Sequence, residues 1–236
     1  MQYFALLLSQ SDVPDERADP AWLEAEMSAY NDFHAREASS IKVGDALTPS
    51  ATGVRIKGGP DAPVITDGPF PESAEIARGF YVFEADDLDA ALALGRQVPI
   101  TRTGAVEIWP MLMEFDPATK LTGEHWLALL FEPPGTTVEP GTPEWEEGIK
   151  RHGEFGAAAG EHIIGGAALH GPATATTVRV RDGEVVLTDG PFVEGAEVAN
   201  GFYVLAAADR DEAAKLASMI PATTVEVRQL MGVGVL

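Results

Sequence analysis

The sequence predicts an α+β protein made of two ferredoxin-like repeats, each with an added β-hairpin, packed as an intramolecular α/β barrel pseudo-dimer. The peptide Thr-Asp-Gly-Pro-Phe occurs at 66–70 and again at 188–192, and Gly-Phe-Tyr-Val follows at 79–82 and at 201–204. Both pairs have the same offset, since 188 − 66 = 122 and 201 − 79 = 122. Two separated motifs that share one offset indicate a duplicated domain.

The first repeat is expected to run strand, helix, strand, hairpin, strand, helix, strand. An apolar run at 3–8 suits a buried strand. Asp19-Pro20 offers an N-cap and a first-turn proline for a helix that ends near Ala38. Four residues recur at helical spacing and are expected to form the buried face of this helix: Leu23, Met27, Tyr30 and His34. The remaining elements are predicted at 41–47, 54–56, 64–66, 79–84, 86–97 and 106–109.

The second repeat shows the same order of elements. Its strands are predicted at 126–131, 163–169, 178–180, 185–187 and 223–230. Thr142 begins its first helix, Asp209 or Asp211 begins its second, and Asp182-Gly183 favours a two-residue hairpin turn. This order is that of a ferredoxin-like unit with an extra hairpin. The stretch 113–123 is predicted to be a linker, so the repeats span 1–112 and 124–236.

Alternation within the strand at 79–84 predicts how the repeats pack. Phe80 and Val82 point to one face of the sheet, and Tyr81 and Phe83 point to the other. Because both faces are apolar, one is expected to lie under the helices and the other against the second repeat. Two sheets packed in this way form an α/β barrel.

Composition limits the classes of partner. The formal charge of −21 over 236 residues disfavours nucleic-acid binding and docking on anionic membranes. The acidity serves either solubility or adaptation to a salty cytoplasm. The chain has no cysteine, which excludes disulfides and thiolate catalysis. The apolar run at its start is too short to span a membrane, so we expect a soluble cytoplasmic protein.

Thr-Asp-Gly-Pro-Phe before a Gly-Phe strand resembles the YCII-related family, which is named for its Asp-Gly-Pro-Phe motif (the DGPF domain). Further residues that carry the resemblance in the first repeat are Tyr30, Phe33, Gly44, Leu47, Pro49, Val106, Glu107 and Pro110. In the second repeat they are Phe155, Gly166, Leu169, Val225, Glu226, Val227 and Arg228. The resemblance implies a dimeric α/β barrel fold. It also implies mostly uncharacterised bacterial proteins, some of them encoded beside or fused to extracytoplasmic-function sigma factors.

A few members of this family resemble dehydrochlorinases, for which a His-Asp dyad with the histidine on the first helix has been proposed. Counting back from Gly44 and Gly166, that histidine position falls at Met27 and Ile149. Neither side chain can carry a proton. The dyad is therefore expected to be absent from both repeats, which leaves open whether the protein is an enzyme.

Three residues are the candidates for proton transfer, namely Asp67, Asp189 and His152. A carboxylate at the barrel mouth is suited to act as a general base or to bind a polar ligand. The alternative is that each Asp-Gly-Pro forms a turn in which the carboxylate accepts backbone amide hydrogens. His152 lies 122 residues after Tyr30 and replaces an aromatic residue on the inward face of a helix. It is either a base in the cleft or a partly buried histidine with a structural role.

Eight residues are predicted to bind a ligand: Tyr30, Phe70, Phe192, Tyr81, Tyr203, Glu107, Glu226 and Arg228. The two phenylalanines are alternatively core residues. Glu226 and Arg228 stand on one face of the last strand and are expected to pair, either as an ion pair at the sheet surface or as part of a pocket. In the first repeat Glu107 is kept while Trp109 replaces the arginine, which would fit two pockets with different roles.

No metal or cofactor is predicted. His162 and His170 lie eight residues apart on one predicted strand, roughly 26 Å at strand rise, which is too far for one zinc ion. The sequence has no glycine-rich phosphate loop and no His-Glu-x-x-His helix.

Three functions are consistent with these observations. The first is a non-catalytic or weakly catalytic small-ligand-binding protein, with a pocket between the sheet and the first helix of each repeat. The second is an enzyme that acts on a small aromatic or carbonyl compound by acid/base chemistry. The third is a regulatory partner, of a sigma factor by the family resemblance, whose acidic surface meets basic protein patches. A homodimer of the fused barrel is compatible with each.

Overall fold

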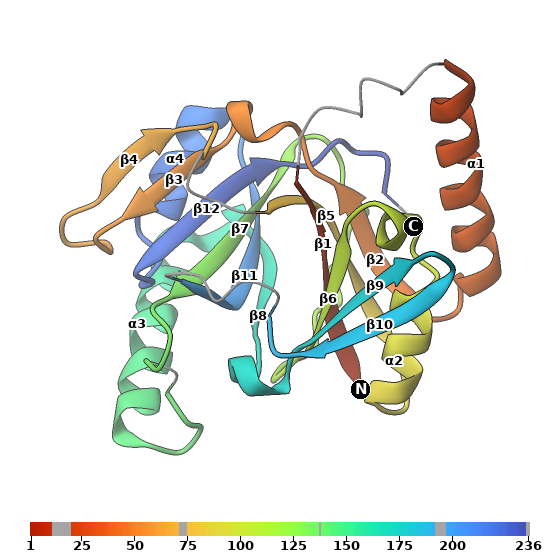
Figure 1. Cartoon of the computed structure of the whole chain (residues 1–236). Helices are drawn as coiled ribbons and strands as arrows, with labels where there is room; N and C mark the ends of the chain where they lie inside the picture. Colours follow the sequence, from red (N-terminus) through yellow and green to blue (C-terminus); the bar gives the residue numbers. More distant parts are fainter. Residues whose placement is uncertain (11–19, 71–74, 137, 192–196, 235–236) are drawn as a thin grey trace.

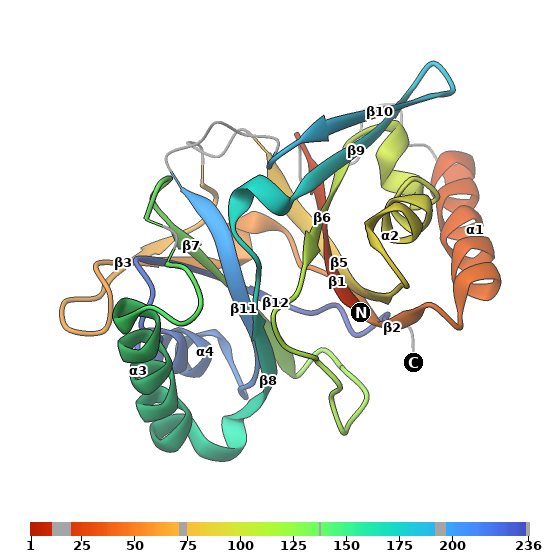
Figure 2. The ribbon, with the colours of Figure 1, turned by 90° about the horizontal axis from the view of Figure 1, so that it is seen from below.

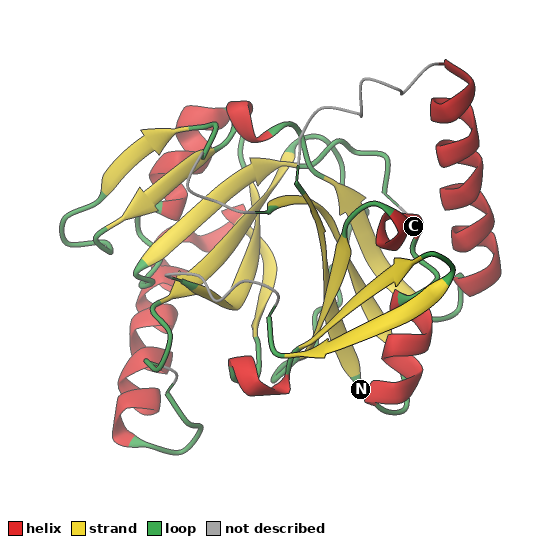
Figure 3. Cartoon of the chain, viewed as in Figure 1, coloured by secondary structure: helices red, strands yellow, loops and turns green. Residues whose placement is uncertain are grey.

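The computed structural model describes residues 1–10, 20–70, 75–136, 138–191 and 197–234 (Figure 1). Two six-stranded antiparallel sheets pack face to face, and helices cover their outer sides (Figures 1 and 2). The fold class expected from the sequence is confirmed: the chain is an α+β protein whose two ferredoxin-like repeats, each with a hairpin, form one barrel (Figure 3).

The first sheet has the strand order β10-β9-β6-β1-β5-β2. Its strands are β1 (Gln2–Ser9), β2 (Ile41–Ala46), β5 (Ile76–Glu84), β6 (Ala105–Pro110), β9 (Thr176–Arg181) and β10 (Glu184–Asp189). The second sheet has the order β4-β3-β12-β7-β11-β8. Its strands are β3 (Val54–Lys57), β4 (Val64–Asp67), β7 (His125–Glu132), β8 (Ile163–Ala168), β11 (Val198–Ala206) and β12 (Thr224–Gln229).

The two hairpins are exchanged between the repeats. The β3–β4 hairpin of the first repeat pairs with β12 of the second, with Arg55 opposite Glu226. The β9–β10 hairpin of the second repeat pairs with β6 of the first, with Thr177 opposite Glu107. Each sheet therefore combines the four ferredoxin-like strands of one repeat with the hairpin of the other (Figure 1).

The barrel closes where the ends of two strands meet the opposite sheet. Leu47, just after β2, forms a β-bridge with Leu230, just after β12. In the same way, Met111 after β6 bridges to Leu169 after β8. The two bridges occupy corresponding places in the two repeats.

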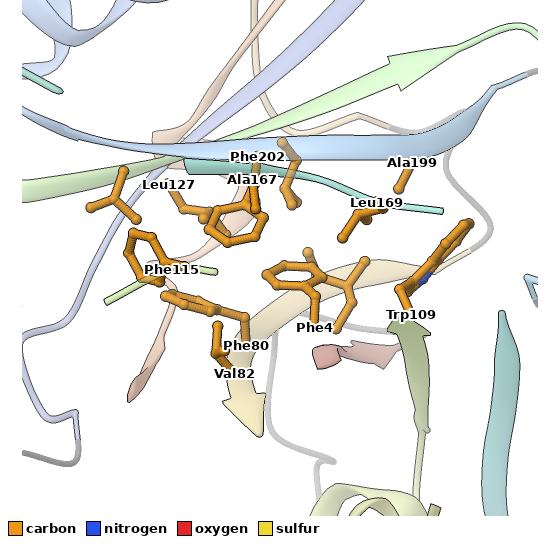
Figure 4. Close-up of a cluster of buried hydrophobic side chains, with 14 of the residues drawn as sticks. Phe4, Phe80, Val82, Trp109, Phe115, Leu127, Ala167, Leu169, Ala199 and Phe202 are labelled. Atoms are coloured by element: carbon orange, nitrogen blue, oxygen red, sulfur yellow. The ribbon is translucent and has the colours of Figure 1, made fainter. Parts of the chain in front are cut away.

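Apolar side chains fill the space between the sheets. The rings of Phe4 and Phe202 stack with centroids 4.6 Å apart, and Phe80, Trp109 and Phe115 are buried beside them (Figure 4). The expectation that one face of β5 packs against the other repeat is confirmed, and Phe80 lies on that face. The middle of the barrel is therefore packed with side chains.

Two helices cover each sheet on its outer face. They are α1 (Pro20–Glu37) and α2 (Leu88–Gly95) on the first sheet, and α3 (Pro143–Ala159) and α4 (Arg210–Ala217) on the second (Figure 2). Asp87, Thr142 and Asp209 act as N-caps, each accepting the backbone N–H three residues later. The expected cap of α1, Asp19, lies outside the described residues.

The buried face of α1 differs from the one that its spacing predicted. Leu23 is 43% exposed and Met27 is 68% exposed, so the expectation that both are buried is wrong. Phe33 is the buried residue, and Tyr30 and His34 are half-buried on the same side. The first six residues of the helix are all exposed, because packing against the sheet begins only after them.

Within the described residues, no helix has both the length and the apolar composition that a membrane span requires.

Candidate functional site

The Asp-Gly-Pro-Phe peptide of the first repeat ends β4 and turns under a short 3-10 helix, η1 (Ser50–Thr52). Asp67 lies opposite Val54, whose side chain packs in the core beneath α4. The Asp67 carboxylate therefore faces α4, where the Arg210 guanidinium donates a hydrogen bond to it. At Gly68, a Cβ atom would come within 1.9 Å of the Ser50 carbonyl oxygen, so the turn requires glycine. Asp67 thus ties the exchanged hairpin to a helix of the other repeat.

Asp189 occupies the corresponding place in the second repeat, opposite Thr176 at the exposed end of β10. The residue that corresponds to Arg210 there is Leu88 (210 − 88 = 122), which has no charge to offer. The predicted ligand residue Phe192 lies outside the described residues. Neither aspartate lies on the barrel side of its hairpin, so the structure separates both from Glu107 and Glu226.

A buried ion network joins β3 to β12, and we call it the β3–β12 contact (Arg55, Glu226, Arg228). Arg55 Nη2 lies 2.7 Å from Glu226 Oε2, and Arg228 Nη1 lies 3.3 Å from Glu226 Oε1. The side chains are 10%, 7% and 0% exposed in the order given. Because Val225 and Val227 face the helices, this network faces the interior of the barrel. The predicted Glu226–Arg228 pair is present, but it is buried rather than at the sheet surface.

Two further interactions complete the β3–β12 contact. Arg228 Nε donates to the Thr48 carbonyl oxygen at 3.1 Å, which connects the end of β12 to the turn after β2. The Arg55 guanidinium lies 4.7 Å from the centre of the Phe70 ring, a cation–π distance. Phe70 is 6% exposed and so serves as a packing partner for a buried charge. Arg55 was not singled out from the sequence, although an arginine inside an apolar strand is a signal for such a partner.

In the corresponding β9–β6 contact (Thr177, Glu107, Trp109), a threonine and a tryptophan stand where the first contact has its two arginines. Trp109 Nε1 donates to Glu107 Oε2 at 3.2 Å, and Thr177 stands opposite Glu107 where Arg55 stands opposite Glu226. Arg179, which follows a valine as Arg55 does, sits two residues further along β9. It forms an ion pair with Glu75 at 3.0 Å. The two contacts share a backbone arrangement and differ in charge.

The first helix of each repeat meets the sheet at a tyrosine, and we call these places the first seam (α1 with Tyr81) and the second seam (α3 with Tyr203). Tyr81 lies across Gly44 and Tyr203 across Gly166, where a Cβ atom would come within 2.1 and 2.6 Å of the tyrosine ring. These glycines on the neighbouring strands therefore fix where each ring lies.

Each seam contains a histidine hydrogen-bonded to its tyrosine. His34 Nε2 lies 2.6 Å from the Tyr81 hydroxyl oxygen, and His152 Nδ1 lies 3.0 Å from the Tyr203 hydroxyl oxygen. The two histidines are not equivalent, because His152 corresponds to Tyr30 (152 − 30 = 122) and His34 corresponds to Gly156. The same pair is thus made from positions one helical turn apart.

Burial sets the protonation of both seams. It lowers the pKa of His34, and burial together with the nearby Arg151 charge lowers the pKa of His152. Burial also raises the pKa of Tyr81 and of Tyr203. Around neutral pH each pair therefore consists of a neutral imidazole and a neutral phenol, which can pass or share a proton.

The two seams differ in the size of the helix side chains that face the sheet. The inward stripe of α1 is Glu26, Tyr30 and His34, and the corresponding stripe of α3 is Gly148, His152 and Gly156. At both glycines an added Cβ would meet no atom within 4 Å. Tyr81 is 5% exposed, whereas Tyr203 is half-buried. The second seam is therefore the more open one.

The structure also places other positions that the sequence analysis named. Met27 and Ile149 are 68% and 51% exposed on the outer faces of their helices. His162 Nδ1 lies 3.0 Å from the Ala206 carbonyl oxygen. Across the residues that the structure describes, no group of three or more His, Cys, Asp or Glu side chains is arranged to hold a metal ion.

Comparison with protein-family models finds the YCII-related domain twice, at residues 4–115 and 132–232. Comparison with curated proteins gives no match. Among solved structures, a "Putative Chlorite dismutase" is 8% identical with a TM-score of 0.46, covering 97% of this chain and 94% of that one. A heme-binding protein from Thermus thermophilus is 11% identical with a TM-score of 0.45, covering 97% and 90%. These two likenesses are too low to bear on what this chain binds.

Proposed function

The chain belongs to the YCII-related family, with two copies of its domain in one polypeptide, and from this premise we propose that it is a small-ligand-binding protein whose ligand is held at the second seam. The ligand class that fits is a small aromatic acid. The observation that carries the proposal is the stripe Gly148, His152, Gly156, which leaves room on both sides of a histidine that is bonded to Tyr203.

The chemistry of the second seam supports this ligand class. The rings of Phe155 and Tyr203 meet edge to face at 5.1 Å and offer an aromatic wall. His152 and Tyr203 supply polar groups that can bind a carboxylate or a hydroxyl group. The positive charge of Arg151 is close enough to affect the pKa of His152, and it favours an acid over a neutral compound.

A thermal-shift screen with small aromatic acids tests the proposal, with two leucine variants to locate the site. We expect a bound acid to raise the Tm of the wild type, and Gly156→Leu to abolish this shift because the side chain fills the seam. Gly153→Leu is the matched control, since Gly153 is exposed and also lies inside α3. Both variants replace a helical glycine and so gain up to about 1 kcal/mol of helix propensity.

Two results would count against the proposal. If no aromatic acid changes the Tm of the wild type, the ligand class is wrong. If Gly156→Leu and Gly153→Leu keep the same ligand-induced shift, the ligand does not occupy the second seam.

Acid/base catalysis is the second candidate, because the same His152–Tyr203 pair is a neutral base next to a phenol. In that case His152 would take a proton from a bound carbonyl compound. His152→Gln would then abolish turnover of this compound, while its Kd would stay within a few-fold of the wild-type value. Binding without turnover would favour the ligand-binding function.

A further inference from the structure

The β9–β10 hairpin ends the first sheet, and its outer strand is exposed along its whole length. All six residues of β10 are exposed, among them three consecutive apolar ones: Val185 at 45%, Val186 at 44% and Leu187 at 52%. In the part of the chain that the structure describes, β9 is the only strand paired with β10. The tip of this hairpin projects beyond the rest of the barrel (Figure 2). An exposed apolar edge strand is a template for pairing with another chain.

The turn of this hairpin determines which backbone groups lie on the free edge. Both residues of the turn at 182–183 have positive φ, 53° and 82°, which is typical of a two-residue hairpin turn. Arg181 and Glu184 flank the turn, so they form a hydrogen-bonded pair. Because hydrogen-bonded and non-hydrogen-bonded pairs alternate along the ladder, the N–H and C=O groups of Val185 and Leu187 point away from β9. These groups are therefore available to a further strand.

One register of antiparallel pairing makes this edge complementary to itself. When two copies of the chain meet about a two-fold axis at Val186, Val185 of each copy lies opposite Leu187 of the other. Both of these pairs consist of residues with outward backbone groups, so together they form about four hydrogen bonds. Glu184 then lies opposite Thr188, which keeps the acidic side chain away from a like charge.

The same register buries apolar side chains on both faces of β10. Leu187 lies opposite Val178, which packs in the core beneath α2, so Val185 and Leu187 are on the helix side of the sheet. In the pair of copies these two residues and their counterparts form one apolar cluster. On the other face Val186 meets its own counterpart. We infer that two copies of the chain associate through β10 in this register and join their first sheets into one.

The corresponding strand of the first repeat, β4, is less suited to such pairing. It has four residues, whereas β10 has six. The residue that corresponds to Val185 is Pro63, since 185 − 63 = 122. Proline has no N–H to donate to a neighbouring strand, and prolines at sheet edges protect them from pairing. A contact through β10 alone uses the same strand of both copies, so the assembly closes as a dimer.

Single cysteine variants test the register, because the chain has no cysteine of its own. In the dimer, residue 186 forms a non-hydrogen-bonded pair with its counterpart, with Cα atoms about 4.5 Å apart, which a disulfide can span. The two copies of residue 187 lie two places apart along the strands, beyond the limit of about 7 Å. We expect mild oxidation to crosslink Val186→Cys at least ten-fold faster than Leu187→Cys. Non-reducing gel electrophoresis measures the rates.

Sedimentation of the wild type tests the dimer without a crosslink. The average mass should rise from that of one chain toward that of two as the concentration increases. Because each copy has a net charge of −21, added salt should strengthen the dimer. Val186→Lys places two like charges opposite each other and should weaken the dimer at least ten-fold. Val64→Lys is the matched control at the corresponding position of β4 (186 − 64 = 122), and it should leave the dimer unchanged.

Three results would overturn the inference. The first is a wild type that stays monomeric at every concentration and salt tested. The second is equal crosslinking of Val186→Cys and Leu187→Cys. The third is a Val64→Lys variant that loses the dimer as Val186→Lys does, which would move the contact away from β10. All three substituted positions are exposed, so the Tm of each variant should stay close to that of the wild type.

Discussion

The β3–β12 contact and the β9–β6 contact hold equivalent hairpins on equivalent strands, yet the residues beside the buried glutamate are two arginines in the first and a threonine and a tryptophan in the second. In the first, Glu226 lies between Arg55 and Arg228. In the second, Glu107 accepts the N–H of Trp109 and faces Thr177. The backbone pairing is the same at both, so the fold tolerates either chemistry. The two halves of the duplicated chain share their architecture and differ in the side chains that are buried beside the glutamate.

The largest expected effect comes from neutralising the two glutamates. Glu226→Gln leaves two buried guanidiniums with one fewer negative charge and should lower the free energy of unfolding by about 3–5 kcal/mol. Glu107→Gln keeps an acceptor for the indole N–H, and threonine and tryptophan stand where Glu226 has its two arginines, so the loss should be smaller than that of Glu226→Gln. Urea denaturation of both variants measures the difference.

Equal losses for the two variants would contradict this view of the contacts. The double variant Arg55→Met with Glu226→Gln is a further test of the β3–β12 contact. Removing the Arg55 charge, which Glu226→Gln leaves without its carboxylate, should recover part of the stability that the single variant loses.

A smaller effect is expected from exchanging glycine and alanine at the turn before each hairpin. A Cβ atom at Gly53 would lie 2.5 Å from Cδ of Arg228 and 2.8 Å from the Val227 carbonyl oxygen, so Gly53→Ala should cost about 1–3 kcal/mol. The corresponding residue is already alanine, since 175 − 53 = 122, and Ala175 is 2% exposed. Ala175→Gly should cost about 1 kcal/mol through backbone entropy.

The midpoint of urea unfolding measures both changes. A Gly53→Ala variant as stable as the wild type would mean that Arg228 can move aside, and the β3–β12 contact would then be less rigid than its hydrogen bonds indicate.

The smallest expected effect is on how the stability of the protein depends on pH, and it differs between the two seams. Burial lowers the pKa of His34 and of His152 in the folded state. The unfolded chain therefore binds these protons first, and the stabilisation is complete above the unfolded pKa of about 6.5 and is lost as the pH falls toward the lower folded pKa. In the first seam, burial raises the pKa of Glu26, which has the opposite sign: its contribution decreases as the pH rises through the carboxylate range.

Burial and the Arg151 charge both lower the pKa of His152, whereas burial alone lowers that of His34, so we expect His152→Gln to flatten the rise of the Tm between pH 5 and pH 7 more clearly than His34→Gln. Comparing each variant with the wild type at the same pH removes the background from the other acidic groups. An unchanged slope in His152→Gln would show that the imidazole is not buried as a neutral group.

Local patterns in the sequence were sufficient for the order of the elements and for the alternating faces of the strands, but not for the buried face of α1. The alternation around Tyr81 divided the side chains of that strand into two faces without assigning either to the helices. Asp87 and Asp209 act as helix caps because a short carboxylate suits that position. The exchange of hairpins was not predictable in this way. Pairing between distant strands depends on tertiary packing, and neither hairpin contains a local signal for one sheet over the other.

The site residues illustrate the same limit. Arg210 became relevant only because the exchange brings Asp67 to α4. Arg179 resembles Arg55 in its neighbours, but it stands 10 residues before Asp189, whereas Arg55 stands 12 residues before Asp67 (189 − 179 and 67 − 55). That spacing was a usable signal for the register. The replacement of Tyr30 by His152 was visible in the sequence, while the space beside it depended on the packing of α3.

The exchange of hairpins also changes what the connection between the repeats is for. Each half of the chain contributes two strands to the sheet of the other, so the halves are held together by hydrogen-bonded strands as well as by the segment at 113–123. A single protease cut in that segment would leave two fragments that remain associated as a heterodimer. Either fragment alone would have an unpaired strand edge and a hairpin without a sheet. The connecting segment therefore ensures that the two repeats, which already bind each other through their exchanged hairpins, are always present in equal number.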